Sequence, residues 1–206
     1  MREYQIESLS SPSVIIVGSG RCGTSTLGKL CHEQLGICMG HSLKMGDKVN
    51  PEGYYEDLVS HAMVRAMANH KDPGPYTPIV YLQVMNHQHR DCLAWGVKDP
   101  WFLYLPIQVL QRLTPKLCIV ALRDVEATIT SWYKMFKASY PGAEITPQIT
   151  AHYKQLTETR QEMCNEIIKI WPNTIYIDFT ERIEEDELAK MIRNGLAMAQ
   201  PNRRQE

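Results

Sequence analysis

The sequence has no long apolar run and no excess of charge of either sign. No window approaches the roughly 20 apolar residues that a membrane-spanning helix needs. Residues 1–13 are polar and lack the apolar stretch of a signal peptide. The formal net charge is −1 at pH 7, which excludes a general attraction to nucleic acid or to anionic membranes. We therefore expect a cytoplasmic protein that binds neither nucleic acid nor a membrane.

Linkers, repeats and paired cysteines are also missing. No stretch rich in Pro, Gly or Ser divides the chain, so residues 1–206 are expected to form a single domain. The six cysteines include no C-x-x-C pair, which favours free thiols that pack as small apolar side chains in a reducing compartment. His87-Gln88-His89 has no further well-spaced ligand, so we expect surface histidines and no metal site.

The chain does contain an apolar segment at 14–17 that runs into Gly18-Ser19-Gly20-Arg21-Cys22-Gly23 and a predicted helix. Glycines let backbone N–H groups point inward, and the helix start adds the positive end of its dipole, so this loop is predicted to bind a phosphate. ATP-binding loops have a lysine where this chain has Thr24. The same surroundings would favour the thiolate of Cys22. The candidate binding residues are Ser19, Gly20, Arg21, Cys22, Gly23, Thr24, Ser25 and Thr26.

Two further apolar segments end in a cation. One is followed by Arg123, and Ser131 comes about two turns into the next predicted helix. The other ends in Lys98. The carboxyl ends of parallel strands share one edge of a sheet, so Arg21, Lys98 and Arg123 are expected to converge there. Arg123 and Ser131 together are predicted to hold a second phosphate.

The order of the elements indicates an α/β fold. Strands that alternate with helices favour a three-layer sandwich with a central parallel sheet and a P-loop-like strand, loop and helix. The predicted strands span 14–17, 95–97, 116–122 and 174–177, and the predicted helices span about 24–35, 57–69, 79–92, 104–113, 125–138, 147–170 and 184–199.

Three parts of the sequence together resemble the motifs of sulfotransferases that use 3′-phosphoadenosine 5′-phosphosulfate (PAPS). They are Arg21-Cys22-Gly23-Thr24-Ser25, Lys98-Asp99-Pro100, and the pair Arg123 and Ser131. The similarity is greatest with the branch that includes tyrosylprotein and bacterial carbohydrate or small-molecule sulfotransferases. It implies that the glycine loop holds the 5′-phosphate and that Arg123 and Ser131 hold the 3′-phosphate. Lys98 would then lie beside the sulfonate, which moves to a hydroxyl or amine without a metal, while Arg21 and the loop amides share the departing phosphate.

The resemblance leaves the general base open among three residues. Glu56 is the first choice, because it lies beside two tyrosines and relatives often use a glutamate in this region. His41 is the rival, since tyrosylprotein sulfotransferases place their acidic base near this position, and Glu52 is the third candidate. Many relatives close a basic loop over the 3′-phosphate, which only Arg193-Asn194-Gly195 and Arg203-Arg204 resemble here.

Other functions also stay open at this stage. A P-loop small-molecule or nucleotide kinase would use the same strand, loop and helix, although Thr24 replaces its lysine. A non-catalytic nucleotide-binding protein of sulfotransferase fold would keep the loop and lose the base. Because the chain is short for the resembled family, a partner subunit or a homo-oligomer could complete the acceptor pocket.

Overall fold

In the computed structural model, which describes residues 11–47, 50, 53–69 and 77–199, four strands form one sheet. Their order is β2-β1-β3-β4, and every neighbouring pair is parallel. The parallel sheet predicted from the sequence is therefore confirmed. The strands are β1 (Val14–Gly18), β2 (Gly96–Lys98), β3 (Leu117–Leu122) and β4 (Thr174–Asp178).

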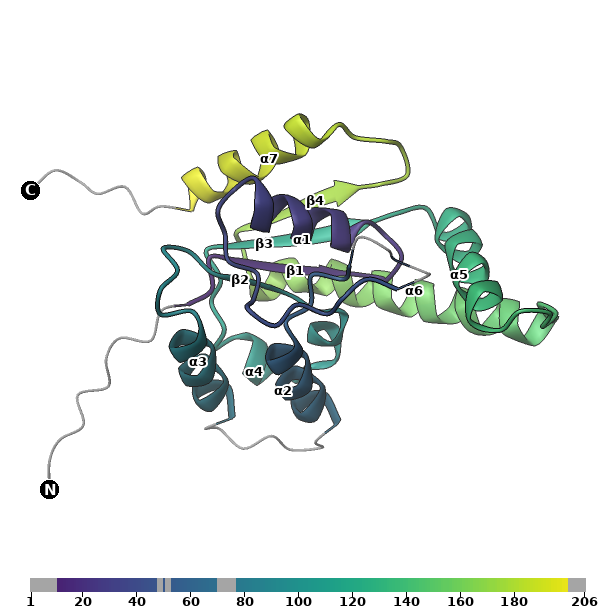
Figure 1. Cartoon of the computed structure of the whole chain (residues 1–206), viewed down its shortest axis with the longest axis horizontal. Coiled ribbons are helices and arrows are strands. Elements are labelled where there is room, and N and C mark those ends of the chain that lie inside the picture. The colour runs from purple at the N-terminus through teal and green to yellow at the C-terminus, as the bar shows by residue number, and fades with distance from the viewer. Residues whose placement is uncertain (1–10, 48–49, 51–52, 70–76, 200–206) are drawn as a thin grey trace, which may run out of the picture.

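Helices cover both faces of this sheet (Figure 1). Helices α1 and α7 cover one face, and α2, α3, α4 and α6 cover the other, with the 3-10 helix η1, so the three-layer α/β arrangement is confirmed. No helix in the described part of the chain has the length and apolar character needed to cross a membrane. The bounds are α1 (Thr24–Glu33), α2 (Leu58–Asn69), α3 (Thr77–Gln88), η1 (Pro100–Tyr104), α4 (Ile107–Leu110), α5 (Val125–Ser139), α6 (Pro147–Ile170) and α7 (Glu185–Met198).

Strand β1 contributes to both halves of the core. Ile15 and Val17 pack under α2, α3 and α6, whereas Val14 and Ile16 pack against α1 and α7. Successive side chains of a strand point to opposite faces, so a strand covered on both faces must be apolar at every position. This explains the continuous apolar run at the start of the described chain.

The segment predicted as one helix over 104–113 differs from the prediction. Tyr104 is instead the last residue of η1, and only Ile107–Leu110 forms the short α4. Leu105 and Pro106 between them have non-helical ψ angles of 142° and 143°. A proline disfavours helical geometry at the residue before it. Helix α3 also ends at Gln88, before the predicted end at 92.

The predicted starts of two long helices are confirmed by their caps. The Asp124 carboxylate accepts a hydrogen bond from the Ala127 N–H at 2.9 Å, which caps α5. Thr146 Oγ1 accepts from the Ile149 N–H at 3.3 Å, and Pro147 occupies the first turn of α6. Both arrangements satisfy backbone donors that a helix start leaves free.

The strand order places a crevice at the carboxyl edge of the sheet. The chain passes from β1 to β2 on one side of it, and then returns to β3 on the other side. The loop after β1 leads to α1 on one face, and the loop after β3 leads to α5, which packs on α6 of the other face. Diverging loops of this kind leave a ligand-binding crevice between them.

Candidate functional site

The loop between β1 and α1 is a tight turn built from residues in the left-handed region. The φ angles are 86° at Gly20, 57° at Arg21 and 91° at Gly23. A Cβ at Gly23 would also lie 2.6 Å from the Phe179 ring, so only glycine fits there. Gly23 is the N-cap of α1, and no side chain caps this end. The first N–H groups of α1 are thus available to an anion.

A cleft of about 510 Å³ opens beside this loop. Arg21, Lys98 and Arg123 all line it, so the three strand ends deliver their cations to one place, as the sequence predicted. Ser19 is fully buried next to the loop. The other predicted residues that line the cleft are Gly20, Cys22, Gly23, Thr24, Ser25, Thr26, Glu56 and Ser131.

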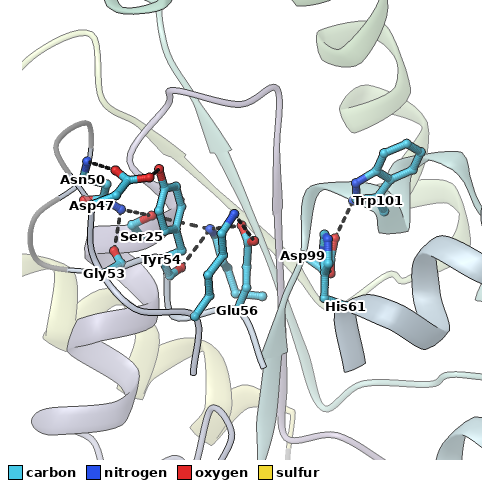
Figure 2. A network of polar contacts seen from close by, with 11 residues as sticks. Ser25, Asp47, Asn50, Gly53, Tyr54, Glu56, His61, Asp99 and Trp101 are labelled. Carbon is cyan, nitrogen blue, oxygen red and sulfur yellow. Dashed lines mark hydrogen bonds and ion pairs between the residues drawn. The ribbon is translucent and has the colours of Figure 1, made fainter. Parts of the chain in front are cut away.

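Lys98, the last residue of β2, is only 5% exposed. Its ammonium donates hydrogen bonds to Glu56 Oε1 at 2.7 Å and to the Tyr54 carbonyl at 2.9 Å. A longer contact of 3.4 Å reaches Ser25 Oγ at the start of α1 (Figure 2). A buried charge needs such partners. Lys98 therefore joins the segment around Glu56 to the glycine loop.

Residues of the segment before α2 form one wall of the cleft. Lys44 Nζ lies 3.9 Å from Glu56 Oε2, and Asn50 Nδ2 donates to Ser25 Oγ at 3.3 Å. The Tyr54 hydroxyl donates to Asp47 Oδ2 at 2.8 Å. Burial and this carboxylate raise the pKa of Tyr54 to about 12, so it stays a neutral phenol. Figure 2 shows these contacts as one network with Glu56.

The opposite wall holds donors that have no partner. Arg21 Nε donates to Ser131 Oγ at 3.1 Å, so Ser131, predicted to act with Arg123, also contacts the glycine loop. Arg123 Nε and Trp132 Nε1 are buried beside the cleft, and neither has a hydrogen-bond partner among the described residues. Buried polar groups are nearly always hydrogen-bonded. These atoms therefore point to a polar ligand.

Arg160, from the middle of α6, lines the cleft although no sequence motif marks it. Its Nε donates to the Tyr104 hydroxyl at 2.8 Å, and its Nη1 donates to the Ser19 carbonyl at 3.4 Å. Only the packing of α6 under the sheet brings Arg160 to this place. With Lys44, it adds to the three cations that the strand ends supply.

His61 of α2 is a second lining residue that the sequence reasoning missed. Its Nδ1 lies 2.8 Å from Asp99 Oδ2, and Asp99 Oδ1 accepts from the Trp101 N–H at 2.8 Å (Figure 2). The hydrogen bond to Asp99 raises the pKa of His61, whereas burial raises the pKa of Asp99. With Nδ1 engaged, Nε2 is the nitrogen left to exchange a proton with a molecule in the cleft.

The prediction that Cys22 favours the thiolate form is wrong. The side chain is fully buried in the core between α1 and the sheet, and this burial raises the pKa of its thiol. A sequence position beside Arg21 and a helix start suggested the opposite. The backbone of the turn directs Arg21 to the cleft and Cys22 to the core.

The remaining candidates lie elsewhere. His41 does not line the cleft, and its ring lies 5.2 Å from that of His89. His89, predicted at the surface, is only 2% exposed. Arg193 is part of α7 and not of a loop that covers the cleft. Glu52, Arg203 and Arg204 lie outside the described residues.

Comparisons with known proteins find similarity among solved structures but not among sequences. No protein-family model matches the chain, and no curated protein matches it. Among solved structures, shikimate kinase from Acinetobacter baumannii in complex with shikimate matches with a TM-score of 0.49 and 14% sequence identity. The match covers 95% of this chain and 97% of that chain. At this identity it concerns the general α/β arrangement alone.

Proposed function

We propose that this protein is a PAPS-dependent sulfotransferase that moves the sulfonate to a hydroxyl or amine of a small molecule or carbohydrate. The observation that carries the proposal is the convergence of Arg21, Lys98 and Arg123 on one cleft. Its glycine loop has Thr24 at the position of the lysine that binds the γ-phosphate in ATP-binding proteins. Such a cleft suits a nucleotide with two separate anionic groups and no γ-phosphate.

The unpartnered donors support the fit of this nucleotide. The glycine loop and the start of α1 would bind its 5′-phosphate, and Arg123, whose buried Nε has no partner in the described structure, would bind its 3′-phosphate. Ser131 Oγ accepts from Arg21 and keeps its own proton to donate. A second hollow, of about 450 Å³, shares Gly23, Thr26 and Arg123 with the cleft and offers room for the nucleoside.

Lys98 is placed to stabilise the departing phosphate. Bound PAPS would supply the sulfonate, and negative charge would then grow on the oxygen that leaves with the 5′-phosphate. A buried, preorganised ammonium stabilises such charge far better than water does. Lys98 could exchange its long contact to Ser25 for that oxygen and keep its two shorter hydrogen bonds to Glu56 and Tyr54.

We assign the general base to Glu56. A base must lie within hydrogen-bond reach of the proton that it removes, and Glu56 is in direct contact with the ammonium that we place beside the sulfonate. Lys98 engages its Oε1 at 2.7 Å, and Oε2, which has only the longer 3.9 Å contact to Lys44 Nζ, is the oxygen that would meet the acceptor. His61, held by Asp99, is the alternative base on the same cleft.

A P-loop kinase is the second candidate function. It is favoured by the hydroxyls of Thr24 and Ser25 at the start of α1, where kinases of this class bind Mg²⁺. The acids at two strand ends are already engaged, however. Asp99 accepts hydrogen bonds from Trp101 and pairs with His61, and Asp124 caps α5.

Isothermal titration calorimetry distinguishes these functions. We expect 3′-phosphoadenosine 5′-phosphate (PAP) to bind without a divalent cation, adenosine 5′-phosphate to bind much more weakly, and Mg-ATP not to compete. Equal affinity for PAP and adenosine 5′-phosphate would remove the 3′-phosphate site, and tight binding of Mg-ATP alone would favour the kinase. Turnover of labelled PAPS on an acceptor panel then separates an enzyme from a protein that only binds the nucleotide.

A further inference from the structure

Four potential metal ligands gather outside the cleft, beside the start of β2. Cys38 and His41 lie in the segment after α1, whereas His89 and Cys92 lie between α3 and β2. Their ligand atoms all lie within 4.8 Å of one another. None of the four residues lines the cleft described above, so the proposed sulfotransferase site gives them no role.

The distances are close to those of a tetrahedral zinc site. His41 Nε2 lies 3.9 Å from Cys38 Sγ and 3.8 Å from Cys92 Sγ, and His89 Nδ1 lies 4.0 Å from Cys92 Sγ. Zn–S bonds of about 2.3 Å and Zn–N bonds of about 2.0 Å place tetrahedral ligand atoms about 3.3–3.8 Å apart. Shifts of a few tenths of an ångström would bring these three pairs to that spacing, and the remaining pairs, which lie within 4.8 Å, would need shifts of up to about 1 Å.

Backbone hydrogen bonds already hold the two ligand pairs together. The Cys38 N–H donates to the Ala94 carbonyl at 2.9 Å, and the Gly96 N–H donates to the Cys38 carbonyl at 3.0 Å. The Cys92 N–H donates to the His89 carbonyl at 2.9 Å. Because main-chain contacts set the positions of the ligands, metal binding has little chain to order, which favours affinity.

The surroundings suit a neutral metal complex. His89 is 2% exposed, and its ring stacks on Trp95 with centroids 5.4 Å apart, so packing fixes the direction of its Nδ1. His41 is exposed, which gives an ion access from solvent. Two thiolates and two neutral imidazoles balance the charge of Zn²⁺, and a neutral complex costs little to place in a half-buried position.

We propose that Cys38, His41, His89 and Cys92 bind one zinc ion in a closed structural site. A tetrahedral set of two sulfur and two nitrogen ligands favours zinc among the common metals, and four protein ligands leave no position for a substrate. These residues escaped the sequence prediction because each pair joins a cysteine to a histidine, as Cys38-x-x-His41 and His89-x-x-Cys92.

The zinc would anchor the segment that leads into the cleft. Cys38 and His41 begin this segment, and Glu56 lies near its end. Asp57 Oδ2 accepts hydrogen bonds from the Ser42 N–H at 3.3 Å and from Gln88 Nε2 at 2.8 Å. The residues next to both ligand pairs are thus tied to the residue after Glu56, and the metal would strengthen this connection.

The first test is the metal content of the full chain, purified without a histidine tag. We expect one zinc ion per chain by plasma mass spectrometry. After chelation, titration with Co²⁺ should give the visible absorption of tetrahedral cobalt bound to thiolates, saturating at one equivalent. Added Zn²⁺ should displace the cobalt and raise Tm, because it binds only the folded chain. Absence of both bound zinc and the cobalt spectrum would overturn the proposal.

Matched variants identify the ligands. His41 and His87 are both exposed, but only His41 belongs to the cluster. His41→Ala should weaken zinc binding by about tenfold or more, and His87→Ala should not; equal affinities would overturn the assignment. A Cys38–Cys92 disulfide in freshly purified protein, found by non-reducing mass spectrometry, would also overturn it. If a variant fails to fold, the Co²⁺ titration of the wild-type chain still tests whether the zinc site exists.

Discussion

Lys98 Nζ lies 2.7 Å from Glu56 Oε1, and the two side chains are only 4% and 7% exposed. The Lys98 ammonium and the Glu56 carboxylate are therefore principal partners of one another in a site that is shielded from solvent. Removing one member of a buried pair leaves the other without compensation. The proposed electrostatic group and the proposed base are thus energetically linked, so their contributions to stability and to turnover must be measured separately.

Lys98→Ala is expected to lower the free energy of unfolding by about 3–5 kcal/mol, because it leaves the Glu56 carboxylate buried and unpaired. Combining Lys98→Met with Glu56→Gln should recover much of that loss, since no lone charge remains. Urea unfolding of Lys98→Met, of Glu56→Gln and of the double variant checks this by a double-mutant cycle. Strictly additive losses would show that the pair is not coupled.

Substitutions of Lys98 or Glu56 should change turnover far more than they change nucleotide affinity. Lys98→Ala should lower kcat on the order of a hundredfold or more, with a much smaller change in PAP affinity, because the charge it meets develops in the transition state. Glu56→Gln should lower kcat by roughly 10²–10⁴ as a lost general base. His87→Gln, exposed and away from the cleft, is the control. Normal turnover of Glu56→Gln would exclude Glu56 as the base.

The pH dependence of kcat/KM distinguishes the two possible bases. Asp99 raises the pKa of His61 above its ordinary value, which is about 6.5. A histidine base would therefore be protonated and inactive as the pH falls through that raised pKa. If His61 is not the base, the pH profile of kcat/KM in this range should be the same in the wild type and in His61→Gln. A loss on acidification that disappears in His61→Gln would transfer the role to His61.

Arg123→Ala should weaken PAP binding by about 1.5–3 kcal/mol, the value of a lost charge-assisted hydrogen bond. Binding of adenosine 5′-phosphate should change little, because this nucleotide lacks the 3′-phosphate. Arg112→Ala, at an exposed position outside the cleft, is the matched control. Calorimetry gives both affinities, and an unchanged PAP affinity in folded Arg123→Ala would place the 3′-phosphate elsewhere.

Gly23→Ala should destabilise the chain and impair nucleotide binding. Its φ of 91° is strained for alanine, and the new Cβ would meet the Phe179 ring at 2.6 Å, so a cost of about 1–3 kcal/mol or more is expected. Gly142→Ala is a suitable control, because Gly142 has a φ of 86° and nothing within 4 Å of the built Cβ. Equal losses of Tm in both variants would mean that only backbone strain matters.

The sequence predicted the locations of site residues that directly follow a strand, because the position of a residue along a parallel strand determines the edge of the sheet at which it lies. Arg21, Lys98 and Arg123 follow apolar strands, and the parallel sheet brings their ends to one edge, so their meeting in one cleft could be predicted. The helix caps at Asp124 and Thr146 were equally predictable, because each is a local hydrogen bond between residues only three positions apart in the sequence.

Contacts that depend on packing between distant elements could not be predicted. His61 and Arg160 reach the cleft from helices, and helical periodicity shows which face is buried but not which cleft that face meets. The opposite directions of Arg21 and Cys22 depend on the φ angles of a single turn. Cys38 meets Cys92 only because its backbone pairs with the residues that enter β2.

The central position of β1 determines when the sheet can form. Its neighbours β2 and β3 begin at Gly96 and Leu117, so neither edge of β1 finds a partner until much of the chain has been synthesised. Closing such long loops costs entropy before the strand pairing compensates for it, which slows folding. On the ribosome, the apolar run Val14–Gly18 would remain exposed during this interval and would need protection from aggregation.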